Sequence, residues 1–244
     1  MRYALTFGTL GIVLALTALR LADGAVGGWR FLVAAEAYTA VCLFTLAAVY
    51  GLRHAGLPVE DLLARRGWSW GSRALLLPYH ALARVALLVT GRLGREAMMC
   101  RVGPGLYVGR LPFPWERGRL ADGGIAAVLS LCWEFPPRPP RPGSGGPVVA
   151  CVPILDGSPP SDRQFRGAVA WVERQRRAGR AVLIHCAQGH GRSATVAAAV
   201  LCRLGLASDA EDALTQVLRA RPRAKPSRAQ TDALRRFLTA SRPP

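Results

Sequence analysis

The chain of 244 residues is almost without lysine: Lys225 is the only one, so nearly all of its positive charge is carried by arginine. Acidic residues are also few, with 15 Asp and Glu against 32 Lys and Arg, which gives a formal net charge of +17. An excess of this size is typical of proteins with an anionic partner, such as nucleic acid, a phospholipid surface or a phosphorylated substrate. A GC-rich genome, which encodes arginine in place of lysine, produces the same excess of arginine, so the charge alone does not identify the partner.

Cysteine pairs at metal-ligand spacing are lacking as well. The six cysteines are scattered along the chain and form no CxxC pair and no Cys/His cluster. This pattern excludes the usual zinc motifs, and we expect neither a metal nor a cofactor. A chain of this length can bury its own core without disulfides, so a reducing compartment fits best.

Two long apolar runs begin the chain. Residues 3–22 carry one charge, Arg20, and residues 29–52 carry Glu36 in their interior. Each run has about 20 residues, the length needed to cross a hydrocarbon core of roughly 30 Å. The first run alone could be a signal peptide, but a second one directly behind it favours a transmembrane helical hairpin, which we assign to residues 1–52.

Basic residues after the second run set the expected orientation. Arg53, His54, Arg65, Arg66 and Arg73 favour a cytoplasmic location for everything C-terminal to the hairpin. We interpret residues 53–96 as a basic juxtamembrane segment whose apolar stretch, residues 74–90, forms an amphipathic helix on the membrane surface. A third span in this stretch is the alternative, and it would place the C-terminal domain outside. The expected protein is thus a multi-pass membrane protein, and nucleic acid is not an expected partner.

From residue 97 onward, strand patterns alternate with helix patterns. The predicted strands are 105–111, 125–132, 148–154 and 181–186, and the predicted helices are 161–179, 192–204, 208–220 and 227–240. Ser161 is the expected N-cap of the first helix and Gly179 its C-cap. This alternation predicts an α/β domain, residues 97–244, with a central, mostly parallel sheet flanked by helices. The segment 136–147, rich in Pro and Gly, is interpreted as a loop insertion in this domain.

A cysteine followed six positions later by an arginine occurs twice, as Cys186 with Arg192 in HCAQGHGRS and as Cys132 with Arg138 in CWEFPPR. Two prolines follow Cys132 and remove two N–H donors, so we interpret that pair as a coincidence of spacing. Cys186 lies between an apolar strand, a glycine-containing loop and a helix N-terminus. Such a junction points several N–H groups at one spot, where they bind a dianionic phosphate and stabilise a thiolate.

The residues around Cys186 suggest separate roles. Arg192 can hold two phosphate oxygens bidentately, and Ser193 can donate to the sulfur when it leaves as a thiolate. His185 is expected to order the loop through its ring hydrogen bonds. The residues expected to bind the phosphate besides Arg192 are those of the loop itself: Ala187, Gln188, Gly189, His190 and Gly191.

A thiolate that attacks phosphorus needs an acid for the leaving oxygen and then a base for water. Asp156, in VPILDGSPP, follows a strand expected to neighbour the Cys186 strand, and it is our candidate for both roles. Asp162 is the alternative, although its place before a helix favours capping. A disulfide between Cys186 and Cys132 or Cys151 under oxidation is another open alternative, which the apolar strand context does not favour.

These residues carry a resemblance. HCAQGHGRSA matches the HC-x5-R-S/T signature, and residues 103–240 resemble the dual-specificity type of Cys-dependent protein tyrosine phosphatases. LYVGRLP, GGIAAVLSLCWE, VPILDGSPP and RARPRAKPSRAQTDALRRFL support it in the same order. The resemblance implies a phosphocysteine intermediate at Cys186, a phosphate held by Arg192, Asp156 as general acid, and no metal. LPFP at 111–114 is also similar to the branch containing mitochondrial phosphatidylglycerophosphate phosphatase.

Three functions stay open on the sequence alone. The leading one is a membrane-anchored phosphatase with a cytoplasmic catalytic domain that acts on phosphotyrosine and phosphoserine/threonine of proteins. The second is a lipid phosphatase acting on a monophosphorylated headgroup. The loop AQGHG holds no Lys or Arg before Arg192, which disfavours a polyphosphoinositide substrate. The third is a membrane scaffold that binds phosphorylated ligands without turnover.

Overall fold

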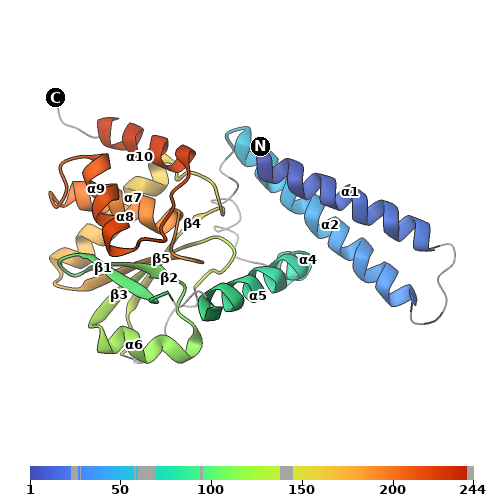
Figure 1. The fold of residues 1–244 in the computed structure, drawn as a ribbon, viewed down its shortest axis with the longest axis horizontal. Coiled ribbons are helices and arrows are strands. Elements are labelled where there is room, and N and C mark those ends of the chain that lie inside the picture. The colour runs from blue at the N-terminus through green and yellow to red at the C-terminus, as the bar shows by residue number, and fades with distance from the viewer. Residues whose placement is uncertain are drawn as a thin grey trace. The chain divides into compact units, whose positions relative to one another are not determined.

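The structure, a computed structural model, describes residues 1–22, 27, 29–57, 59, 70–93, 96–137 and 145–240. Two compact units make up the chain, Met1–Leu88 and Val89–Pro244. Figure 1 shows a pair of long helices in the first unit and a sheet flanked by helices in the second. Each of the two compositionally different halves seen in the sequence therefore forms its own folded body.

The two apolar runs form the paired helices α1 (Arg2–Ala22) and α2 (Trp29–His54) (Figure 1). Gly11 brings the helices close, because a Cβ at this position would lie 3.0 Å from the Phe44 ring. Thr17 of α1 donates a hydrogen bond to Glu36 of α2, so this carboxylate has a polar partner inside the pair. The side chains of α1 that face away are apolar and exposed: Leu5, Leu10, Ile12, Val13, Leu16 and Leu19.

Both helices are long and apolar enough to cross a membrane. A signal sequence near an N-terminus passes the same test of length and composition, so the membrane anchor stays a prediction. The stretch 74–90 is mostly helical as expected: α4 (Trp70–Leu75) is followed, after a turn at Leu76, by α5 (Leu77–Leu93). Leu82 and Val85 of α5 are exposed. Arg65 and Arg66, on which the expected orientation partly rests, lie outside the described residues.

The second unit is built on a five-stranded sheet in the order β1-β2-β5-β3-β4. Strands β2, β5, β3 and β4 run parallel, while β1 pairs antiparallel with β2 at one edge. The strands are β1 (Met99–Gly103), β2 (Leu106–Arg110), β3 (Ile125–Cys132), β4 (Val148–Ile154) and β5 (Ala181–Cys186). The predicted α/β class with a mostly parallel sheet is confirmed.

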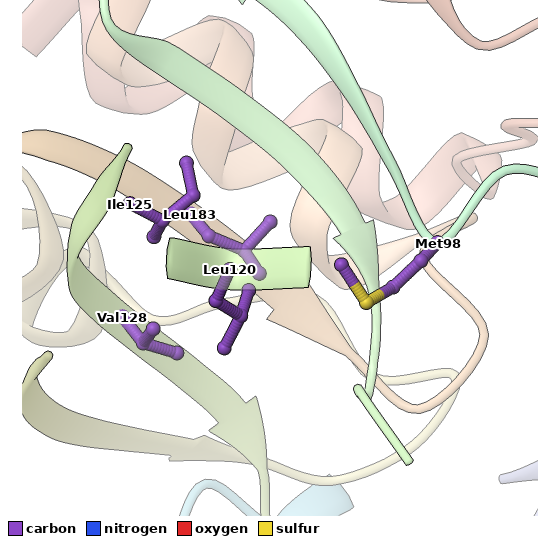
Figure 2. Packing of buried hydrophobic residues seen from close by; sticks show 5 residues of the cluster. All are labelled: Met98, Leu120, Ile125, Val128 and Leu183. Atoms are coloured by element: carbon purple, nitrogen blue, oxygen red, sulfur yellow. The ribbon is translucent and has the colours of Figure 1, made fainter. Parts of the chain in front are cut away.

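Helices cover both faces of this sheet. The C-terminal group packs together on one face (Figure 1), and its members are α7 (Asp162–Arg177), α8 (Arg192–Arg203), α9 (Ala210–Ala220) and α10 (Arg228–Ala240). On the other face lies α6 (Arg117–Asp122), preceded by the 3-10 turn η1 (Pro114–Glu116). Figure 2 shows Leu120 of α6 in a buried cluster with Met98, Ile125, Val128 and Leu183. Burial of these side chains fixes strands β3 and β5, which lead to the site.

The predicted bounds of β3, β4 and β5 are confirmed. Ser161 caps α7 as expected: its hydroxyl accepts from the Gln164 N–H, and the Gln164 side chain accepts from the Ser161 N–H. The C-cap residue of α7 is Ala178, and Gly179 follows it with a φ of +73°, the left-handed conformation that ends a helix. β1 and α6 were not predicted, because each is a short element of five or six residues without a clear period.

Candidate active site

Cys186 is the last residue of β5, the central strand of the sheet, and Arg192 is the first residue of α8. β5 is fully apolar up to His185 and buried between β2 and β3, so the chain delivers Cys186 to the carboxyl edge of the sheet. The Cys186 side chain is buried, and its Sγ lies 3.2 Å from the Gly189 N and 3.4 Å from the Ser193 Oγ. The sulfur therefore lies at a helix N-terminus beside an N–H and a hydroxyl group, both able to stabilise a thiolate.

Every backbone carbonyl group of the loop from Ala187 to Gly191 accepts a hydrogen bond. Each of the five carbonyl oxygens accepts a hydrogen bond from a donor outside the loop, in order the Leu111 N–H, two guanidinium nitrogens of Arg221, the Lys225 N–H and the Thr195 N–H. Gly189 adopts a φ of +78° and abuts β2, where an added Cβ would lie 2.6 Å from the Gly109 carbonyl oxygen. Since the carbonyls are directed outward, the loop can turn its N–H groups toward the sulfur.

The Arg192 side chain is 2% exposed and is held by a carboxylate and a backbone carbonyl group. Its Nη1 and Nη2 donate to the Glu134 carboxylate at 2.8 and 2.6 Å, and Nη1 also donates to the Ile154 carbonyl oxygen at 2.8 Å. Burial alone would lower the pKa of Arg192, but the charge and hydrogen bonds of Glu134 raise it well above its ordinary value. The buried Nε finds no hydrogen-bond partner among the described residues. It is therefore the donor left for an anion.

Glu134 is a site residue that the sequence did not reveal. It lies two residues after the end of β3, its side chain is 3% exposed, and it forms the bidentate pair with Arg192. The prolines after Cys132 cannot present amides to an anion, so the sequence pattern assigns that segment no role. An acidic residue just past a buried parallel strand was the available signal, since parallel strands end at one edge of a sheet. Arg138, which has the same spacing to Cys132 as Arg192 has to Cys186, lies outside the described residues.

Asp156 is brought to the same place. It lies two residues after β4, and its Oδ1 is 2.9 Å from Arg192 Nη2 while the side chain stays 60% exposed. Asp162, the alternative acid, begins α7 next to its N-cap. The loop that carries Asp156 is tied down by Gln230 of α10, whose Nε2 donates to the Ser158 carbonyl oxygen at 3.2 Å. The structure thus brings Asp156 next to Arg192, at a position open to solvent.

His185 is buried and its ring is hydrogen-bonded to the backbone at the end of β5. Its Nδ1 lies 3.2 Å from the Cys186 carbonyl oxygen, which can only accept, so Nδ1 carries the ring proton. Burial, with a smaller contribution from the charge of Arg192, lowers the pKa of His185 to about 4. The ring is therefore neutral at pH 7 and donates to the Cys186 carbonyl group, directly before the loop.

His190 has a partner that the sequence did not indicate. Its Nε2 lies 2.7 Å from Glu96 Oε2, and the other oxygen of Glu96 pairs with Arg221 at 3.1 Å. The His190 side chain remains 30% exposed. Glu96 lies 94 residues before His190, and Arg221 is one of many arginines, so no local pattern could single out either.

The remaining cysteines do not join the site as a metal cluster. No group of three or more His, Cys, Asp and Glu suited to a metal ion occurs in the part of the chain that the structure describes. All six cysteines are free thiols. Burial raises the pKa of the Cys132 thiol well above its ordinary value and keeps it protonated. A disulfide between Cys186 and Cys132 or Cys151 stays an untested alternative.

Known proteins resemble the second unit of the chain in sequence. Residues 117–241 match the family described as Swiss Army Knife protein, DSP-PTPase phosphatase domain. The chain is 38% identical over 104 residues to dual specificity protein phosphatase 12 of Mus musculus, which covers 42% of this chain and 30% of that relative. It is 33% identical over 134 residues to human dual specificity phosphatase 28, covering 53% of this chain and 71% of the relative. The chain thus spans only about 30% of the length of the first of these relatives.

Solved structures give the same fold. The crystal structure of Tk-PTP in the active form superposes with a TM-score of 0.53 at 30% identity, over 57% of this chain and 95% of that chain. PTPMT1 in complex with PI(5)P superposes with a TM-score of 0.51 at 20% identity, over 59% of this chain and 96% of that chain. At that identity the second likeness shows the fold alone.

Proposed function

This chain belongs to the family of DSP-type protein tyrosine phosphatase domains, and on that premise we propose that it hydrolyses phosphomonoesters through a phosphocysteine intermediate at Cys186. The observation that carries the proposal is the position of the Cys186 sulfur, 3.2 Å from the Gly189 N in the loop that leads into α8. The buried guanidinium of Arg192 follows in the same turn, with its Nε free for an oxygen of the phosphate. Sulfur, amide and guanidinium together fit a thiolate that attacks a bound phosphate dianion.

The proposed reaction has two steps. In the first, the Cys186 thiolate forms a bond to phosphorus while the bond from phosphorus to the ester oxygen breaks, and the leaving oxygen takes the proton of Asp156. In the second, the Asp156 carboxylate accepts a proton from water, the water oxygen bonds to phosphorus, and Cys186 leaves as a thiolate. Ser193, with its Oγ 3.4 Å from the sulfur, donates to this thiolate. Arg192 balances the charge on the phosphate oxygens throughout.

The pair between Asp156 and Arg192 suggests how the acid comes into use. Asp156 Oδ1 lies 2.9 Å from Arg192 Nη2, while its side chain is 60% exposed. A phosphate dianion carries more charge than the carboxylate and competes with it for the guanidinium. Substrate binding would thus release Asp156 from Arg192 and let its carboxyl group face the leaving oxygen.

We propose phosphorylated proteins as the substrates, with phosphotyrosine and phosphoserine/threonine as the groups removed. Relatives that match the chain are named dual specificity protein phosphatases, which supports this class. The loop between Cys186 and Arg192 also offers no Lys or Arg to bind further phosphates. We further propose residues 97–244 as the catalytic domain, facing the cytoplasm, and residues 1–52 as its two-span membrane anchor. Alkaline phosphatase activity from a fusion at the C-terminus would contradict this orientation.

A lipid phosphatase is the second candidate, and the N-terminal helices favour it. An anchor of two apolar helices would hold the catalytic domain within reach of bilayer headgroups. A headgroup with one terminal phosphate, such as that of phosphatidylglycerophosphate, suits a loop without additional basic side chains. Positive charge over the whole chain would strengthen its attraction to anionic lipid.

The deciding experiment is phosphate release by the full-length protein in mixed micelles, with Cys186→Ser as control. A phosphotyrosine peptide and phosphatidylglycerophosphate are compared side by side. Faster release from the peptide supports the protein phosphatase, and faster release from the lipid supports the second candidate. Release no greater than that of Cys186→Ser on either substrate, with phosphopeptide binding retained, would make the protein a non-catalytic scaffold.

A further inference from the structure

Arg221 is a buried cation that lies outside the proposed reaction path. It caps the C-terminal end of α9, and its side chain is 1% exposed. Its Nε donates to the Gly189 carbonyl oxygen at 2.8 Å, and its Nη2 donates to the Gln188 carbonyl oxygen at 3.1 Å. One guanidinium thus binds two successive carbonyl groups of the catalytic loop. A planar fork of donors is suited to this task, because it fixes both acceptors at once.

Glu96 supplies the counter-charge from another part of the chain. Its Oε1 lies 3.1 Å from Arg221 Nη2, and its Oε2 lies 2.7 Å from His190 Nε2. The neighbouring Ala97 carbonyl oxygen accepts from Arg221 Nη1 at 2.9 Å. The segment that precedes β1 therefore contacts Arg221 and, through His190, the catalytic loop. A buried arginine needs such a partner, because an unpaired charge at this depth is strongly destabilising.

The direction of these contacts matters for anion binding. In a trans peptide group, the carbonyl of one residue and the N–H of the next point in opposite directions. Because Arg221 holds the Gln188 carbonyl outward, the Gly189 N–H points inward, and it is found 3.2 Å from the Cys186 sulfur. By the same geometry, holding the Gly189 carbonyl outward turns the His190 N–H inward.

We propose that Arg221 and Glu96 are positioning residues that orient two amides of the catalytic loop toward the phosphate. The proposal rests on the proposed function in taking a phosphate ester as the ligand of that loop. Neither side chain touches the substrate: they act through the Gln188 and Gly189 carbonyl groups. Glu96 lies outside the family-matched residues 117–241 and directly before the proposed catalytic domain, residues 97–244, so a residue ahead of that domain would complete its anion site.

The test compares full-length variants by two independent readouts. The first is the dissociation constant of inorganic phosphate, measured by calorimetry without turnover, and the second is kcat/KM on a phosphotyrosine peptide. Arg221→Lys is the informative variant: it keeps the charge pair with Glu96, but one ammonium group cannot reproduce the fork to both carbonyls. Arg221→Met removes both the charge pair with Glu96 and the hydrogen bonds to the two carbonyl groups. The matched control is Arg219→Met, at an exposed position of α9.

We expect Arg221→Lys to weaken phosphate binding about tenfold, the loss of roughly one hydrogen bond to a charged group. For Arg221→Met, kcat/KM should fall about 100-fold, as a loop displaced by an ångström would cause. Glu96→Gln should shift both readouts in the same direction by less, and Arg219→Met should leave both unchanged. If Arg221→Met does not fold, the phosphate dissociation constants and kcat/KM values of Arg221→Lys and Glu96→Gln test the proposal.

Phosphate binding and turnover equal to wild type in a folded Arg221→Lys protein would overturn the proposal, because a purely structural ion pair is satisfied by lysine. Phosphate binding and phosphate release by the wild-type protein distinguish this result from a failure of the proposed function. If wild type binds phosphate but releases none from a substrate, the phosphatase assignment fails, while the effect of Arg221→Lys on phosphate binding still tests the positioning role.

Discussion

Replacing Glu134 by glutamine should weaken both the fold and the reaction, because this carboxylate is the main support of Arg192. The pair is bidentate, at 2.6 and 2.8 Å, and the two side chains are only 3% and 2% exposed. The glutamine side chain would keep one acceptor oxygen, but its amide NH₂ group would face the NH₂ groups of the guanidinium. The Glu134→Gln variant thus removes the charge and turns one hydrogen bond into a clash between donors.

The expected size follows from the burial of the pair. Removing one partner of a buried ion pair costs about 3–5 kcal/mol, and Glu134→Gln should fall near 3 kcal/mol because one acceptor remains. For a chain of this size, each kcal/mol lowers Tm by about 2–4 °C. A fall in Tm of about 6–12 °C is therefore expected. Arg192 loses its fixed orientation as well, and kcat/KM should fall about 100-fold.

The assay is thermal unfolding together with kinetics on a phosphotyrosine peptide, at temperatures well below the Tm of the variant. Glu173→Gln is the control, since Glu173, 19% exposed, pairs with two partly or largely exposed arginines, Arg177 at 3.3 Å and Arg203 at 4.0 Å. Such a pair contributes about 1 kcal/mol or less. A Glu134→Gln protein with the Tm and kcat/KM of the control would refute the role given to Glu134.

Three further predictions concern the loops around the sulfur. Asp156→Ala should lower kcat about 10²- to 10⁴-fold through loss of the general acid and tighten phosphate binding, since the carboxylate no longer competes for the guanidinium; an unchanged kcat would remove Asp156 from the mechanism. Gly189→Ala should cost about 100-fold in kcat/KM, because its Cβ would lie 2.6 Å from the Gly109 carbonyl oxygen. Gly205→Ala, with a φ of +69° but open space around it, is its control, and equal loss in both would show that strain alone is at work. His185 has a folded pKa of about 4, below its unfolded value, so the stability that depends on its neutral form is complete above pH 6.5 and is lost as pH falls toward 4. Urea unfolding at several pH values should show His185→Gln losing about 3 kcal/mol less over this window than wild type, and identical pH profiles would contradict the shift.

The sequence was informative wherever a local pattern governs structure. Three parallel strands were predicted with their bounds, because apolar runs bounded by Gly and Pro leave little choice. The capping box at Ser161 was found in the same way. Cys186 and Arg192 could be paired because strand, loop and helix are consecutive in the chain. The expectation that the strand before Asp156 neighbours the Cys186 strand was wrong, because β3 lies between β4 and β5. Parallel strands nevertheless end at the same edge of a sheet, and Asp156 reaches Arg192 at 2.9 Å from the more distant strand.

Residues that act across large sequence separations were missed. Glu134 reaches Arg192 over 58 positions, and Glu96 reaches His190 over 94. Each is a single acidic residue whose partner at the site lies far away in the chain, so its role depends on a tertiary fold that composition and periodicity do not encode. Arg221 was hidden for the opposite reason. With 32 basic residues in the chain, one buried arginine cannot be told from the exposed ones without the structure.

The most direct test of the account is to trap the covalent intermediate. The full-length protein would be mixed with a phosphotyrosine peptide, quenched within the first turnover, digested and examined by mass spectrometry. The account predicts a phosphoryl group on the peptide that contains Cys186, enriched in Asp156→Ala if hydrolysis of the intermediate is slowed more than its formation, and absent from Cys186→Ser. Phosphate release by wild type with no phosphoryl group on Cys186 at any quench time, or with undiminished release by Cys186→Ser, would contradict it.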